Sequence, residues 1–259
     1  MRRVLRKLPG HAPRAARGFT VVELMVTIAI ALFLLGGLVT IVQSVRRTYA
    51  DQQALVQLQD QQRFAITLLT DIVQSGGYYD NPVGDTISSA LPTFAPLGQG
   101  QAFYGLQGAA LPAAGDTIYV RFRTAQNDGI INCSGGSNTA FAPDAVYTNK
   151  LYVNANQQLV CELSVNGGAF SAPVPLVNGV ANLAVYYGVK RQIPAADYNV
   201  DTYEQATAAA NDWLNVSAVR VIVTFVNPLF GAPNQPVTTP QYITVERVIQ
   251  VMSRAGDYT

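Results

Sequence analysis

The hydrophobic pattern opens with a long, uninterrupted apolar segment. Residues 24–42 contain no charged side chain. Folded as an α-helix, this segment would extend roughly 28 Å, about the thickness of the hydrocarbon core of a bilayer. We therefore expect one transmembrane helix here, within a helical region that begins near Phe19.

The pattern then changes from uniformly apolar to amphipathic. Residues 43–75 lack Gly and Pro, so we expect the helix to continue through them. Apolar residues recur at steps of three and four, with Gln62 at the one missing position: Leu55, Leu58, Ala65, Leu69 and Ile72. Such a stripe is typical of a helix face that packs against a sheet. Gly76 and Gly77 follow and predict a C-terminal cap.

The remainder of the chain has the pattern of a β-rich domain. Residues 78–115 are rich in Pro, Gly and Ala and predict a long irregular connection. Alternating apolar and polar positions then predict strands. These are residues 117–124, 150–154, 158–163, 180–189, 216–226 and 242–252, with a hairpin turn at 154–157. One long helix followed by strands and turns predicts an α+β fold with a largely antiparallel sheet.

A second helix is predicted near the C-terminal end. Thr202 followed by Gln205 fits a capping box, and an Ala-rich segment follows, so we expect a helix over residues 202–214. Trp213, the only tryptophan, would end this helix. We expect it to anchor the core rather than to form a ligand platform, because large aromatic side chains dominate core packing.

Charge gives this arrangement an orientation. Residues 1–18 carry six basic groups and no acidic group, whereas the other residues carry eleven basic and sixteen acidic groups. Basic residues beside a transmembrane helix remain in the cytoplasm, so the β-rich head is expected on the opposite side of the membrane. The acidic character of the head argues against general binding of nucleic acid.

Composition excludes several classes of enzyme. The only histidine, His11, lies in the basic leader, and if residues 1–18 are removed no histidine remains for catalysis or metal binding. Two cysteines cannot form a Cys₄ metal site. The sequence also lacks the P-loop, nucleophile-elbow and H-E-x-x-H motifs. We expect no enzymatic activity, no cofactor and no metal site.

Glu23 is the exception in an otherwise apolar segment. A carboxylate at the edge of a membrane helix costs up to about 3 kcal/mol if it lies deep, so it usually has a partner. Cleavage after Gly18 would create an amino group on Phe19, one helical turn from Glu23. The amine of a neighbouring copy would then neutralise Glu23 and set the axial register between subunits. The alternative is a glutamate that lies in the headgroup region.

These residues resemble a known family. Arg17, Gly18, Phe19 and Glu23, followed by the apolar segment, are similar to the class III signal of type IV prepilins and of type II secretion pseudopilins. The resemblance implies that a prepilin peptidase cleaves after Gly18 and methylates the amine of Phe19. It also implies a pilin-like fold in which the long helix packs on the sheet. The implied parts are the leader (1–18), the transmembrane helix (19–42), the periplasmic half-helix (43–76) and the head (77–259).

A second resemblance narrows the family. The polar stretch at residues 57–65 and the closing Gly76-Gly77-Tyr78 are similar to PilW-type minor pilins. This implies a protein of the inner membrane, and then of the pilus, that helps to start a type IV pilus and caps its tip. Its implied partners are other minor pilins, the major pilin and the assembly platform. A J-type minor pseudopilin of type II secretion is the alternative, and a tip adhesin or DNA-binding subunit is a further one.

Two pairs of residues in the head carry more specific expectations. Cys133 and Cys161 are the only cysteines, and a periplasmic location favours a disulfide between them over two free thiols. Arg121 and Arg123 alternate with core positions of one strand, and together with Tyr119 they form a candidate basic surface. We expect that surface to be solvated or ion-paired rather than to bind DNA. Asp80, Asn81 and Asp85 lack the spacing of an EF-hand and predict a turn rather than a calcium site.

Overall fold

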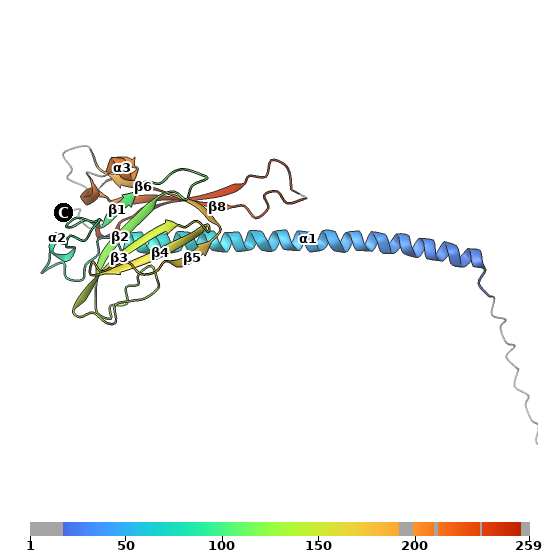
Figure 1. Cartoon of the computed structure of the whole chain (residues 1–259), viewed down its shortest axis with the longest axis horizontal. Helices are drawn as coiled ribbons and strands as arrows, with labels where there is room; N and C mark the ends of the chain where they lie inside the picture. The colour runs from blue at the N-terminus through green and yellow to red at the C-terminus, as the bar shows by residue number, and fades with distance from the viewer. Residues whose placement is uncertain (1–17, 192–198, 210–211, 234, 255–259) are drawn as a thin grey trace, which may run out of the picture. The chain divides into compact units, whose positions relative to one another are not determined.

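A computed structural model describes residues 18–191, 199–209, 212–233 and 235–254 (Figure 1). The chain divides into two compact units, Met1–Gln52 and Gln53–Thr259, each of which is described by itself. Helix α1 (Val21–Gln74) crosses the boundary between them. The boundary lies beyond the end of the predicted transmembrane segment at residue 42, so part of the predicted periplasmic half-helix belongs to the first unit.

Helix α1 ends where the sequence predicts. The amide of Gly76 donates to the carbonyl of Val73, and Gly77 adopts a φ of +76°, the left-handed conformation that glycine favours at this position. The amide of Gly77 then donates to the carbonyl of Arg121 in the second strand of the head. The cap therefore also fixes the end of α1 to the sheet.

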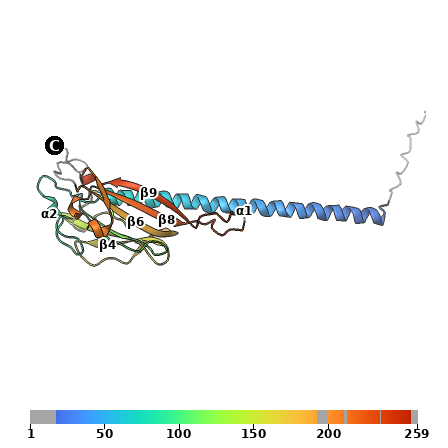
Figure 2. The ribbon, with the colours of Figure 1, turned by 90° about the horizontal axis from the view of Figure 1, so that it is seen from above.

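Two antiparallel sheets make up the head (Figures 1 and 2). The first has five strands in sequential order: β1 (Phe103–Leu106), β2 (Thr117–Ala125), β3 (Asp144–Val153), β4 (Gln158–Val165) and β5 (Val174–Asn178). The second has the order β7-β6-β8-β9, with β6 (Val180–Val189), β7 (Thr202–Glu204), β8 (Ala218–Val226) and β9 (Tyr242–Gln250). Short helices complete the described elements: α2 (Ile87–Ala90), α3 (Ala206–Ala209), η1 (Trp213–Asn215) and η2 (Met252–Arg254). The predicted α+β fold is confirmed, with two sheets where one was expected.

One hydrophobic core joins α1 to both sheets. Its helical members are Leu58, Ala65, Leu69, Ile72 and Val73, all of them buried. They share this core with residues of the first sheet, such as Ile118 and Leu151, and of the second, such as Leu183 and Val221. The predicted stripe is therefore the packing face of α1, although Leu55 at its start is only half-buried.

The predicted helix over residues 202–214 is mostly wrong. Thr202–Glu204 forms β7, which pairs with Tyr187–Val189 of β6. Among the described residues before η1, only Ala206–Ala209 is α-helical, and residues 210–211 of the predicted helix lie outside the described residues. The open edge of β6 gives these backbone groups partners, and Thr and Tyr favour strands, so tertiary pairing overrides the local capping pattern. The expectation for Trp213 is confirmed: it is buried, with its ring 4.8 Å from that of Tyr187 and 5.4 Å from that of Tyr104.

Other strands differ from the expectation at their ends. The connection over residues 78–115 includes α2 and β1, and β3 begins at Asp144, six residues earlier than predicted. Polar residues in the first half of β3 are the reason why the sequence pattern did not predict a strand there. The side chain of Asn149 can be buried because both of its polar groups have partners. Its Nδ2 group donates to the carbonyl of Val120, and its Oδ1 accepts from the backbone amide of Cys133. The predicted turn at residues 154–157 is present, with Gln157 at a φ of +57°.

Candidate assembly helix and head

The predicted processing and assembly residues lie at the start of α1. Gly18 and Phe19 precede the helix, and Glu23 lies in its first turn. The hydroxyl of Thr20 accepts a hydrogen bond of 3.3 Å from the amide of Glu23, which gives a first-turn donor its partner. A carboxylate in the first turn is also favoured by the helix dipole. Sequence reasoning missed this cap, although the Thr-x-x-Glu spacing of Thr20 and Glu23 could have indicated it.

The first unit presents its apolar side chains outward. Every residue from 18 to 50 is exposed, and Phe19 is 77% exposed. Among the described residues, α1 is the helix that is long and apolar enough to cross a membrane. The hydroxyls of Thr27 and Thr40 donate to carbonyls one turn earlier, at 2.9 and 2.7 Å. Their polar groups therefore have partners inside the helix, as a lipid environment requires.

The expectation of a basic surface at Arg121 is wrong. Its exposed fraction is 0%, and its guanidinium donates only to backbone carbonyls, those of Leu91, Pro92, Gly98 and Gln101. Burial lowers the pKa of Arg121 to about 10, so the group remains protonated at neutral pH. The carbonyls lie in the connection between α2 and β1. Arg121 therefore holds that connection against the first sheet.

Arg123 is also buried, and it binds carboxylates. Its guanidinium bonds Asp80 at 2.7 Å, approaches Asp144 at 3.4 Å and also pairs with Asp85. The hydrogen bond from Arg123 lowers the pKa of Asp85. Asn81 forms the expected turn by accepting from the amide of Gly84. The carboxylates considered for calcium thus bind a protein cation, and neither arginine offers a surface to nucleic acid.

The two cysteines form the expected disulfide. Cys133 and Cys161 are bonded, with Cα atoms 6.0 Å apart, and both are buried. The bond ties the loop between β2 and β3 to the middle of β4. Two side chains of that loop, Ile131 and Phe141, are exposed. The described residues contain no group of three or more His, Cys, Asp or Glu side chains arranged to hold a metal ion.

Two family models match this chain. The prokaryotic N-terminal methylation motif matches residues 13–39, and the type IV pilus-assembly protein W family (PilW) matches residues 146–255. The chain therefore carries the N-terminal methylation motif of type IV pilins and, in its C-terminal half, a region similar to the PilW family. The first match contains Gly18, Phe19 and Glu23, and the second spans almost all of β3 to β9, including Cys161 and Trp213.

The other comparisons add little to this assignment. A type IV-like pilin from Thermus thermophilus is similar in structure, with 14% sequence identity and a TM-score of 0.41, over 76% of this chain and 98% of the other. No curated protein matches the chain. Arg121, Arg123 and Cys133 lie outside both matched regions, so their roles are inferred from the contacts that they make in this structure.

Proposed function

We propose that this protein is a PilW-type minor pilin that helps to initiate type IV pilus assembly and takes a place in the tip complex. Prepilin peptidase would cleave it after Gly18 and methylate the new amine of Phe19. The observation that supports this most directly is the position of the methylation motif, which lies at the start of a helix whose apolar side chains are exposed from residue 21 to 50. Such a surface needs a cover that the chain itself does not provide.

Two different environments would surround these exposed apolar side chains in turn. In the inner membrane, lipid would surround residues 24–42, with the N-terminus cytoplasmic and the head periplasmic. In the pilus, the helices of other minor pilins and of the major pilin would replace the lipid. An assembly platform would carry out that transfer. None of these steps requires catalysis, a cofactor or a metal ion from this chain.

Glu23 would set the register of the assembled helices. Its carboxylate would pair with the methylated amine of Phe19 on a neighbouring subunit, which removes both charges from contact with lipid. The position of Glu23 in the first turn, close to the helix start, supports this role because it leaves the carboxylate near the end of the helix where a neighbour's terminus would lie. The disulfide and the buried arginines would keep the head rigid while the helix moves.

A J-type minor pseudopilin would share the processing and the helix. The PilW family match favours the pilus over the type II secretion system. The hypothesis of a DNA-binding subunit depended on an exposed pair of arginines, and Arg121 and Arg123 are buried. For an adhesin, the exposed loop between β2 and β3 offers surface but no identified ligand.

The test compares three variants in a strain that lacks the chromosomal copy. Gly18→Ala should leave an uncleaved precursor, and Glu23→Ala should be cleaved yet fail to restore pili. Glu23→Asp keeps the carboxylate and serves as the matched control, which should restore pili at least in part. Sheared pili and type II secreted proteins are measured together. Normal pili with Glu23→Ala would contradict the register role, and intact pili with lost secretion in the deletion strain would assign the chain to the pseudopilus.

A further inference from the structure

Strand β9 leaves one edge of the second sheet open. It has nine residues and pairs on one side with β8, and no described strand pairs with its other side. The ladder bonds Ser217 to Val251 and Asn227 to Gln241, so the odd-numbered residues of β9 bond β8. The N–H and C=O groups of Thr244, Glu246 and Val248 therefore point away from β8. A long edge with free backbone groups is a template for an added strand.

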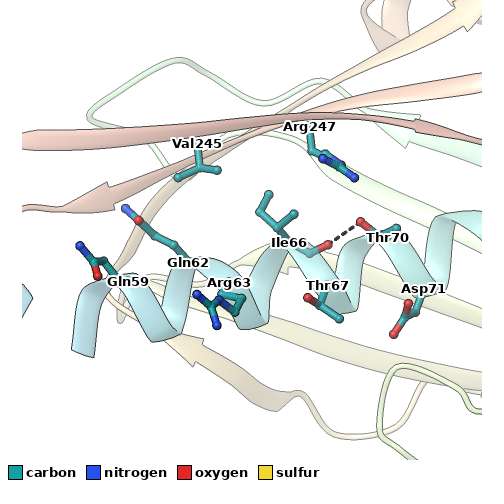
Figure 3. A pocket seen from close by; sticks show the side chains of 9 residues that line it. All are labelled: Gln59, Gln62, Arg63, Ile66, Thr67, Thr70, Asp71, Val245 and Arg247. Atoms are coloured by element: carbon teal, nitrogen blue, oxygen red, sulfur yellow. Dashed lines mark hydrogen bonds between the residues drawn. The ribbon is translucent and has the colours of Figure 1, made fainter. Parts of the chain in front are cut away.

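A groove lies beneath this edge, between β9 and the part of α1 in the second unit, Gln53–Gln74. Its volume is about 550 Å³. The lining residues are Gln59, Gln62, Arg63, Ile66, Thr67, Thr70, Asp71, Val245 and Arg247. Figure 3 shows Gln62 and Ile66 rising from α1 toward β9, while Val245 and Arg247 descend from β9 toward the helix. A strand added beside β9 would place every second side chain over this groove.

The groove contains hydrogen-bond donors without acceptors. The Nε2 atom of Gln62 is buried and bonds no described residue. No carboxylate among the described residues lies within ion-pair distance of Arg63 or Arg247. This differs from Arg220 on the neighbouring strand, whose guanidinium pairs with Glu246 at 2.7 Å. The free donors outnumber the one carboxylate of the groove, Asp71, and favour an acidic occupant.

We propose that β9 and this groove receive an extended segment of a different pilin subunit, which pairs with β9 as a further strand. An acidic side chain of that segment would lie between Arg63 and Arg247, and an apolar one would contact Ile66 and Val245. A second copy of this chain fits poorly, because pairing two β9 edges would bring Arg247 toward Arg247. The inference rests on the proposed function, since it assumes that the chain enters a pilin assembly.

Site-specific photo-crosslinking in living cells tests the proposal on the full chain. A benzophenone amino acid replaces Thr67, an exposed lining residue of the groove. The same probe at Val174, an exposed residue of β5, is the control position. We expect the Thr67 probe to capture another pilin subunit, and we expect mass spectrometry to place the link in an extended segment that contains Asp or Glu. Capture of a second copy of this chain, or of lipid alone, would overturn the proposal.

Two pairs of variants show whether the edge and the charges carry the contact. Thr244→Pro removes a backbone donor from the open edge, whereas Thr244→Ala keeps it. We expect the first to lower crosslinking at least about tenfold, a factor that corresponds to roughly 1.4 kcal/mol, and the second to leave it unchanged. Arg63→Glu with Arg247→Glu should have the same effect as Thr244→Pro, while Arg63→Lys with Arg247→Lys should retain most of the signal. Unchanged crosslinking in Thr244→Pro and in the double Glu variant would reject this site.

Folding and assembly are scored separately in the same strains. Each variant should accumulate to the level of the parent and melt within a few degrees of it, because the substituted side chains are exposed or partly exposed. The presence or absence of pili tests the proposed function. The crosslink from Thr67 tests whether the groove binds another pilin subunit. Pili that do not depend on this chain would reject the function even if the crosslink persists. Pili that depend on it, together with a Thr67 link that the Thr244→Pro and double Glu variants leave unchanged, would reject only the groove.

Discussion

The two halves of α1 follow opposite rules although they form one helix. From residue 21 to 50 every side chain is exposed, and the apolar ones occupy the whole circumference. From residue 53 to 74 the apolar side chains form a stripe, and five of them are buried in the core of the head. The first half needs a cover from outside the chain, and the second is covered by its own domain. Exposure of an apolar residue therefore has a different meaning on each side of the boundary.

Polar groups show the same contrast. In the first half, threonine hydroxyls bond back to carbonyls of the helix itself. In the second half, charged side chains occupy exposed positions, where water can solvate them: Asp60, Arg63 and Asp71. One helical backbone is therefore suited to lipid in its first half and to water and the protein core in its second. Substitutions at equally exposed positions of the two halves should have different effects.

The largest difference is expected from a buried charge in lipid. Leu35 and Val56 are exposed to nearly the same extent, at 57% and 56%. Leu35→Arg places a charge near the centre of the proposed membrane segment, at a cost of about 3 kcal/mol, and should release most of the protein from the membrane or lead to its degradation. Val56→Arg is the matched control and should leave membrane retention unchanged. Carbonate extraction measures both, and equal retention would show that residues 24–42 are not in lipid.

A comparable effect, this time on the stability of the head, is expected in the buried half of the helix. Leu69 is fully buried in the core, so Leu69→Ala should lower the free energy of unfolding of the head by about 3–4 kcal/mol. Leu38→Ala makes the same change in the first half and should leave the head unchanged, because Leu38 is exposed. Denaturant unfolding of the detergent-solubilised chain, followed by the fluorescence of Trp213, measures both variants. A similar loss in Leu38→Ala would remove the distinction between the halves.

Much of this division could be predicted from the sequence because it depends on periodicity. The charge-free segment, the stripe through Leu58 and Leu69, and the glycine cap are local patterns, and the structure has all three. Strand β6 was also predicted to the residue, since its apolar positions carry a strong pattern. The order of Gly18, Phe19 and Glu23 indicated a family that the motif match confirms.

The missed features depend on contacts that are distant in the sequence. Alternation predicted an exposed Arg121, because nothing local shows that carbonyls of a loop about twenty to thirty residues earlier surround it. Strand β7 forms because β6 offers it an edge, whereas its own sequence favours a helix start. The groove beside β9 joins residues separated by almost the whole head. Neither charge nor periodicity alone would have placed Arg63 and Arg247 in the lining of one groove.

An effect of similar size should follow from loss of the disulfide. The Cys133–Cys161 bond joins residues separated by 28 positions, and in the chain-entropy model it stabilises the folded state by about 3.5 kcal/mol. The Cys133→Ala and Cys161→Ala double variant should therefore lose stability in the head while its membrane retention stays normal. Reduction of the wild-type chain should give a similar decrease in melting temperature, and the variant itself should not respond to reductant. A variant as stable as the oxidised parent would show that the loop is held by its other contacts.

The smallest effect is a dependence on acid in the stability of the head, which contains carboxyl groups with a lowered pKa. The hydrogen bond from Arg123 lowers the pKa of Asp85. At Glu162 burial acts to raise the pKa, but bonds from Lys150 and Tyr152 outweigh it and the net shift is downward. Carboxyls with a lowered pKa in the folded state stabilise it fully above their ordinary pKa, near 4, and lose this contribution as the pH falls through the lower folded values.

The melting temperature of the head should accordingly be level above about pH 5 and decline below about pH 4. Arg123→Gln removes the cation that lowers the pKa of Asp85, and Lys150→Gln does the same for Glu162. Each variant should melt earlier at neutral pH and should show a shallower decline in acid than the parent. Arg220→Gln is the matched control on an exposed pair, and because solvent screens that pair it should change the profile least. An acid decline as steep in both glutamine variants as in the parent would assign the acid sensitivity to other groups.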